Sequence, residues 1–198
     1  MNSLFVKRVK EYFTENSEKY LELLSKKPTH GFFLNTLKAS KTDIFDIIDF
    51  DYEESNLNEN AYYTNTVSIG KSKAYELGLI YPQDVESSFS STFINNNDIN
   101  LIVDLCAAPG GKSINIINKY PNALCIANDV NYLRSSELSK NLERLGLTNT
   151  IITNKEPKDL VKYLKGNVDL VILDVMMPKK DGYETLTELR RESEVPVV

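Results

Sequence analysis

The chain has 198 residues, of which 41% are hydrophobic and 26% are charged, so it is long enough to bury a sizeable core. Its net charge of -5 excludes strong bulk attraction to phosphate, and nucleic acid could bind only through a local basic patch. No apolar run approaches the roughly 18 residues of a membrane span. Charges interrupt the N-terminus MNSLFVKRVKEY where a signal peptide would be apolar, so we expect a cytoplasmic protein.

The cysteine and histidine content argues against disulfides and structural metals. Cys106, Cys125 and His30 form neither a paired cysteine framework nor a zinc-ligand cluster. Both cysteines are expected to act as small buried hydrophobes. The acidic stretch over residues 49–60 is interpreted as a solvated loop in preference to a metal site.

The N-terminal part predicts two short helices followed by a strand. Apolar residues recur three and four apart from Leu4 to Leu24, with a break at Asn16 and Ser17. The aromatic run over residues 31–38 follows a proline and a glycine and predicts a strand.

A helix is expected after this strand, with Thr42 and Asp43 at its start and an apolar face formed by Ile44, Ile47 and Ile48. The asparagine-rich stretch 95–98 marks a domain boundary. Residues 1–98 are therefore predicted to form a small α+β subdomain and its lead-in.

From residue 101 onward, strands and helices alternate regularly. The predicted strands are 101–105, 124–128, 150–153 and 170–174, and the predicted helices are 112–119, 132–145 and 157–164. Such alternation is typical of right-handed β-α-β units around a parallel sheet. We therefore predict an α/β, Rossmann-like domain over residues 99–174.

A turn of small residues follows the first core strand. From Asp104 the sequence is DLCAAPGGKS, which would bring backbone N–H groups to the carboxyl edge of the sheet, where ligands of such sheets bind. Asp129 follows the second strand, 25 positions after Asp104, near the spacing at which a carboxylate accepts hydrogen bonds from a ribose. These features indicate a ribose-bearing ligand without a pyrophosphate. The alternative is structural: Gly110 and Gly111 make a tight turn and Asp129 caps the next helix.

A P-loop nucleotide site is a competing interpretation of the same turn. Gly111, Lys112 and Ser113 end the pattern correctly, and the strand 170–174 could act as a Walker B strand. Cys106 stands where the first glycine of a P-loop is required, so a P-loop nucleotide-binding protein ranks lowest.

Three successive segments resemble motifs of the bacterial ribosomal RNA cytosine-5 methyltransferases of the Sun type: DLCAAPGGKS, ANDVNYLRSSELSKNLERLGL and VDLVILD. Upstream, FLNTLK and GLIYPQDVESSFSS resemble that family's N-terminal subdomain, although Phe33 stands where the family usually has an arginine. The resemblance covers about residues 4–174. It implies a Rossmann-like class I methyltransferase sheet, incomplete in this chain, with S-adenosylmethionine as cofactor and ribosomal RNA as partner.

The resemblance also implies roles for particular residues. Asp129 would hold the ribose of the cofactor, Glu156 would lie near its adenine, and Asp174 would lie beside the reacting site. Arg134 and Asn141 match family positions as well, but are interpreted as structural. Backbone groups of a loop would cradle the methionine part, and that loop comprises Cys106, Ala107, Ala108, Pro109, Gly110, Gly111 and Lys112.

The chemistry that the resemblance implies needs two cysteines, one that adds to the cytosine ring and one that assists release. Met177 stands at one of these family positions, and the other would lie past Val198. A thioether cannot form a thiolate. The chain is therefore expected to have no catalytic residue of its own and to be inactive as it stands.

The C-terminal segment, about residues 168–198, also resembles the middle of a response-regulator receiver domain. In such a domain Asp174 would be the phosphoacceptor, which implies an alternative role as a signalling or interaction module. The acidic pair that would hold magnesium is missing, because Leu105 follows Asp104. Residues 175–198 are instead expected to complete the sheet of a chimeric or truncated methyltransferase, through a strand at 195–198 and a helix that buries Tyr183, Leu186 and Leu189.

Overall fold

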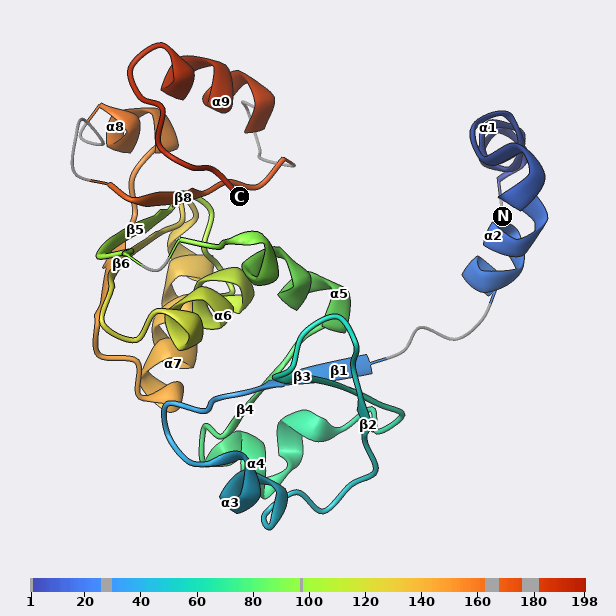
Figure 1. The fold of residues 1–198 in the computed structure, drawn as a ribbon, viewed down its shortest axis with the longest axis horizontal. Helices are drawn as coiled ribbons and strands as arrows, with labels where there is room; N and C mark the ends of the chain where they lie inside the picture. Colours follow the sequence, from blue (N-terminus) through green and yellow to red (C-terminus); the bar gives the residue numbers. More distant parts are fainter. Residues whose placement is uncertain (1, 26–29, 97, 163–167, 176–181) are drawn as a thin grey trace.

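The computed structural model describes residues 2–25, 30–96, 98–162, 168–175 and 182–198. It contains a helical hairpin, an antiparallel sheet and a parallel sheet (Figure 1). The N-terminal elements are α1 (Ser3–Phe13), η1 (Thr14–Asn16), α2 (Ser17–Ser25), β1 (His30–Leu34), α3 (Lys41–Phe45), β2 (Glu53–Glu54), β3 (Ala61–Thr64), η2 (Ile69–Lys71), α4 (Lys73–Glu76), β4 (Ile80–Pro82), α5 (Val85–Ser88) and η3 (Phe89–Phe93). The others are β5 (Leu101–Asp104), α6 (Gly111–Lys119), β6 (Leu124–Asn128), α7 (Tyr132–Leu145), β7 (Thr150–Thr153), α8 (Pro157–Val161), β8 (Leu170–Ile172) and α9 (Gly182–Arg190).

The N-terminal hairpin confirms the two predicted helices and the break between them. The side chain of Asn2 accepts a hydrogen bond from the Leu4 N–H and so caps α1. The 3₁₀ turn η1 reverses the chain, and the Phe13 and Tyr20 rings stack across it with their centroids 4.3 Å apart.

The antiparallel sheet has the strand order β2-β3-β1-β4. Side chains alternate along β1, so Phe32 and Leu34 pack on Ile44 of α3 while Phe33 faces the other way. The expected helix start was wrong by two to three residues: Ser40 is the N-cap and accepts a hydrogen bond from the Asp43 N–H. Ser40 has the β-region backbone that a cap requires and lies one residue before the first helical residue, Lys41.

The parallel sheet has the order β7-β6-β5-β8, which confirms the predicted α/β, Rossmann-like architecture with a small α+β subdomain before it. Val197 adds a parallel bridge to Val171, so the chain's last residues lie along the free side of β8. Alternating side chains face the two helical layers: Ile102 packs with α6 and α7, whereas Val103 packs with α9. Figure 1 shows α8 and α9 on the opposite side of this sheet from α6 and α7.

One expected buried side chain of α9 lies at the surface. Tyr183 is 66% exposed, while Thr185 and Leu189 are buried. Tyr183 and Leu189 are six positions apart, about 120° around a helix, so both cannot face the sheet. The packing of Leu189 against Val171 and Val195 decides which side is buried.

The acidic side chains of residues 49–60 are exposed as expected, but the stretch is not a loop throughout, because Glu53 and Glu54 form β2 and Asn58 is buried. Within the described ranges, no group of three or more His, Cys, Asp or Glu side chains could hold a metal ion. In the same part of the chain, no helix combines the length and apolar character needed to cross a membrane.

The two sheets share one hydrophobic core. Phe33, Tyr81 and Val85 of the N-terminal subdomain pack in the same cluster as the apolar faces of α6 and α7. Asn35, fully buried, donates from its side-chain amide to the carbonyls of Gly78 (2.9 Å) and Leu145 (2.8 Å). The C-terminal end of α7 is thus capped by the preceding subdomain.

Replacing Asn35 by alanine tests this connection. Two buried carbonyls would lose their donor, so we expect the free energy of unfolding to fall by about 2–3 kcal/mol. Urea denaturation measures the change, with Asn95→Ala at an exposed position as the control. A wild-type midpoint for Asn35→Ala would show that the amide contributes nothing to the packing of the two sheets.

Candidate functional site

The candidate site lies at the carboxyl edge of the parallel sheet. The loop between β5 and α6 begins after Asp104 and ends at Gly110, the residue before the first residue of α6. Gly110 has φ +123°, and a Cβ there would lie 3.1 Å from Ile114 Cδ1 and 3.2 Å from Leu138 Cδ1. Only glycine combines this backbone conformation with such close packing of the loop against α6 and α7.

The buried carboxylate of Asp104 holds both ends of this loop. Its Oδ1 accepts the backbone N–H of Cys106 (3.1 Å), and its Oδ2 accepts the hydroxyl of Ser113 (2.5 Å). Burial raises the pKa of Asp104 to about 6, and the hydrogen bonds from Ser113 and Cys106 oppose that rise. Asp104 therefore acts as an internal brace, which the sequence did not predict for it.

Asp129 presents a buried acceptor beside the loop. It follows β6, and its Oδ1 accepts the Asn131 N–H at 2.8 Å. Its Oδ2 is buried without a hydrogen-bond partner, and Arg134 Nη1 lies 3.4 Å away as an ion pair. A buried carboxylate oxygen gains free energy when it accepts a donor, so this atom is suited to a ligand hydroxyl.

Asn128 ties the ends of three neighbouring strands together. Its side-chain NH₂ donates to the carbonyls of Leu105 (3.1 Å) and Lys155 (3.0 Å). Its Oδ1 accepts from the Thr153 hydroxyl and the Lys155 N–H, both at 2.9 Å. The only hint of this role in the sequence is a polar residue at the end of an apolar strand.

Helix α7 fastens the outer part of the loop. Arg134 donates to the carbonyl of Ala108, and Asn141 Nδ2 donates to the carbonyl of Pro109 at 2.9 Å. The sequence identified both residues as structural, and their contacts are with the candidate site itself. Both residues match family positions, and they lie seven positions apart, about two turns along one side of a helix. This shared side was the signal in the sequence that could have assigned them to the candidate site.

The N-terminal subdomain also reaches the loop. Gln83 Nε2 donates to Asn115 Oδ1 of α6 at 3.0 Å. A Cβ at Gly111 would lie 2.8 Å from Gln83 Oε1, so a larger residue there would displace this side chain. The sequence did not identify Gln83 as part of the site.

The remaining predicted residues lie at the same edge. Lys112 Nζ donates to Asp174 Oδ2 at 3.2 Å, which joins the start of α6 to the segment after β8, since this strand ends at Ile172 and not at the predicted residue 174. Glu156 is the N-cap residue of α8, just after the end of β7. Ala107 and Ala108 are buried in the loop, whereas Pro109 is exposed. Met177 lies outside the described residues.

Neither cysteine has the environment of a nucleophile. Burial, reinforced by the charges of Asp104 and Asp129, raises the pKa of the Cys106 thiol to about 12. Burial also raises the pKa of Cys125, which is fully buried as predicted, while Cys106 is partly exposed. Both thiols therefore stay protonated at neutral pH, where nucleophilic addition needs a thiolate.

Gly110→Ala is expected to lower the free energy of unfolding by about 1–3 kcal/mol, because an L side chain is strained at this φ. Gly70→Ala is the matched control, since a Cβ there meets nothing within 4 Å. Thermal and urea unfolding measure both variants. Equal losses for the two variants would contradict the conformational requirement at Gly110.

Asp104 predicts a distinct pH dependence of stability. Its pKa in the folded protein is about 6, above the ordinary value of 3.8, so the folded state binds this proton more tightly than the unfolded chain does. Stability should therefore fall as pH rises from about 4 to about 6 and level off above, by at most about 3 kcal/mol.

The measurement is urea denaturation across this pH range for wild type and Asp104→Asn, whose amide does not titrate. The difference in free energy between the two proteins should change with pH in this window. Parallel curves would show that Asp104 has an ordinary pKa in the folded state.

Two protein-family descriptions match consecutive parts of the chain. Residues 1–85 match the N-terminal domain of 16S rRNA methyltransferase RsmF, and residues 91–178 match 16S rRNA methyltransferase RsmB/F. The second match includes the loop after β5, Asp129, the strand β8 and Asp174, two residues after that strand.

Individual relatives agree with these matches. A 28S rRNA (cytosine-C(5))-methyltransferase of Mus musculus is 31% identical over 71% of this chain and 18% of its own length. A tRNA (cytosine(49)-C(5))-methyltransferase of Pyrococcus abyssi is 28% identical over 81% of this chain and 53% of its own length. The chain thus spans about half or less of these curated relatives.

Solved structures share the fold. The crystal structure of PH0851 superposes with a TM-score of 0.82 at 20% identity, over 98% of this chain and 50% of that chain. NSun6 from Pyrococcus horikoshii, solved with SFG, superposes with a TM-score of 0.77 at 16% identity, over 88% of this chain and 70% of that chain. From the two consecutive family matches and these relatives, the chain belongs to the RsmB/F family of RNA cytosine-C5 methyltransferases.

Proposed function

We propose that this chain is the S-adenosylmethionine-binding part of an RNA cytosine-C5 methyltransferase. The observation that carries the proposal is the buried Oδ2 of Asp129, which has no hydrogen-bond donor and lies beside a glycine-containing loop at the carboxyl edge of the sheet. A ribose offers two adjacent hydroxyl donors to such a carboxylate. NSun6, which has the same fold, was solved with SFG, an analogue of S-adenosylmethionine.

The residues of the loop fit the other parts of this cofactor. Backbone groups from Cys106 to Lys112 would surround the methionine part, because Gly110 and Gly111 keep side chains out of the turn. Glu156 would lie near the adenine and Asp174 beside the reacting atoms. When bound, the cofactor supplies an electrophilic methyl group.

The substrate in this proposal is RNA, and ribosomal RNA is favoured because both family descriptions are of 16S rRNA methyltransferases. The tRNA methyltransferase among the relatives makes tRNA the second candidate. We propose that this chain alone does not complete the reaction, since Met177 replaces one family cysteine and neither Cys106 nor Cys125 can form a thiolate near pH 7.

We propose that the C-terminal segment extends and covers the parallel sheet and has no signalling role. Leu189 of α9 is fully buried, and Val197 bridges to Val171. The family match reaches residue 178 and so includes Asp174, whose receiver-like role as a phosphoacceptor we rank second. The P-loop alternative gains no support, because the hydroxyl of Ser113 is buried and donates to Asp104, whereas a P-loop would use it to hold a magnesium ion.

Calorimetric titration with S-adenosylhomocysteine tests the cofactor site. We expect wild type to bind and Asp129→Asn to bind about 10- to 100-fold more weakly, because a hydrogen bond to a charged acceptor contributes about 1.5–3 kcal/mol. Asparagine keeps an oxygen to accept the Asn131 N–H, so the fold should survive.

The matched control is Asp98→Asn, an exposed acidic residue away from the loop. It should bind like wild type. Folded wild-type protein that does not bind S-adenosylhomocysteine, or equal affinities for the Asp129 and Asp98 variants, would overturn the assignment of Asp129.

A further inference from the structure

The hairpin of α1 and α2 exposes an unusual amount of apolar surface. Figure 1 shows it standing apart from both sheets. Val9 is the only apolar residue of the two described helices that is buried. The large apolar side chains exposed to solvent here by 42–82% are Leu4, Phe5, Tyr12, Phe13, Leu23 and Leu24.

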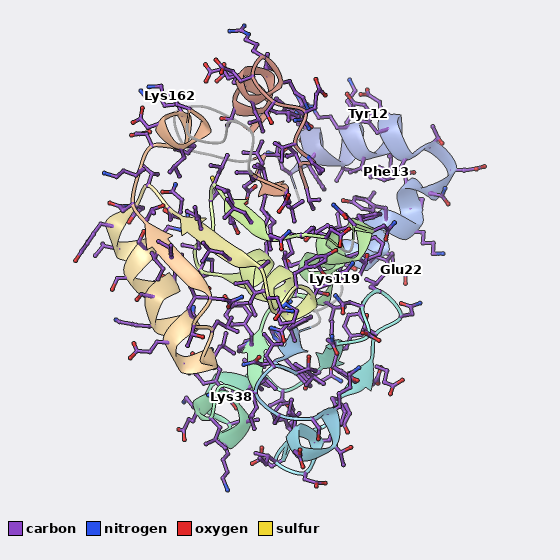
Figure 2. The ribbon with its side chains drawn as sticks, turned by 60° about the vertical axis from the view of Figure 1, so that its left-hand side comes forward. Tyr12, Phe13, Glu22, Lys38, Lys119 and Lys162 are labelled. Atoms are coloured by element: carbon purple, nitrogen blue, oxygen red, sulfur yellow. The ribbon has the colours of Figure 1, made fainter. Side chains whose placement is uncertain are left out.

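Such a hairpin has little to stabilise it by itself. Its helices have 11 and 9 residues, and isolated helices below about 12–15 residues are marginal in water. The contacts that stabilise it include the stacked rings of Phe13 and Tyr20, the burial of Val9 and an exposed ion pair of Lys10 with Glu18 at 2.8 Å. Figure 2 shows Tyr12 and Phe13 on this hairpin. Phe5 and Tyr12, seven positions apart, lie on one side of α1.

The charge of the hairpin favours a protein partner over RNA. Residues 3–25 carry four basic and four acidic side chains, so there is no excess positive charge to attract phosphate. Several exposed large apolar side chains on one short hairpin, with balanced charge around them, are typical of a surface that is covered by another apolar protein surface.

The lengths of the solved relatives point to a candidate for that surface. PH0851 superposes over 98% of this chain, so only about four of the 198 residues lie outside the superposed part. The superposed part therefore includes most of the hairpin. The superposed part is only 50% of PH0851, so an equal length of chain belongs to the same protein beside this fold. Residues 1–85, hairpin included, also match the family's N-terminal domain.

We propose that the apolar side of α1 and α2 docks on the second half of an RsmB/F methyltransferase domain, the half that this chain does not contain. The hairpin is thereby the interaction surface that joins the N-terminal subdomain to the rest of the enzyme. Its partner is a folded α/β surface with complementary apolar side chains, and a second copy of this chain is the competing occupant.

Hydrogen–deuterium exchange on the 198-residue chain tests the first half of this proposal. Amides of α1 and α2 should exchange at least 100-fold faster than those of β1, because the undocked hairpin opens freely. Protection of the hairpin equal to that of β1 in a monomeric chain would overturn the proposal. Protection that appears with a homodimer in analytical ultracentrifugation would assign the surface to a second copy.

Co-expression of the tagged chain with the second half of the Pyrococcus abyssi relative tests the partner. A 1:1 complex should form, and Phe5→Glu with Tyr12→Glu should weaken it at least 10-fold. Tyr132→Glu, at an exposed aromatic on α7, is the matched control and should retain the complex. No complex between soluble partners, or equal binding by both variants, would contradict the proposal. The exchange experiment decides independently if the second half is insoluble.

Discussion

The candidate site depends on the hydrogen bonds made by the side-chain amide of Asn128. This amide is fully buried and links the ends of β5, β6 and β7 through bonds to Leu105, Thr153 and Lys155. Parallel strands leave their carboxyl ends without a hairpin to connect them, so separate loops would otherwise move independently. A satisfied buried amide fixes these loops relative to one another and sets where the next residue, Asp129, points.

Helix α7 connects that edge to the N-terminal subdomain. Arg134 in its first turn and Asn141 two turns later donate to the carbonyls of Ala108 and Pro109. At its end, Arg144 stacks on the Tyr75 ring at 3.8 Å and donates to the Tyr75 carbonyl at 2.7 Å. One rigid element therefore contacts both the candidate cofactor loop and the subdomain before it, which explains why the two share a core.

The two ends of the described chain differ in how they are held against the fold. The last residues lie against β8 through backbone hydrogen bonds, with Leu173 N–H donating to the Val198 carbonyl at 2.9 Å. The hairpin at the other end lacks comparable burial. Backbone pairing in a sheet uses main-chain groups and not particular side chains, so these last residues extend the sheet without contributing chemistry to the candidate site.

The sequence by itself determined the parallel core. The elements β6, α7 and β7 have the predicted bounds, because a regular spacing of apolar residues bounded by clear turns leaves few alternative assignments of helix and strand. It also identified the loop after Asp104 and the acidic residue after β6. Only the tertiary structure decided that Asp104 is a buried brace, that Asn128, Gln83, Arg134 and Asn141 support the loop, and that Tyr183 is exposed. These contacts join residues from elements far apart in the chain, and local patterns carry no information about which distant partner a polar side chain will meet.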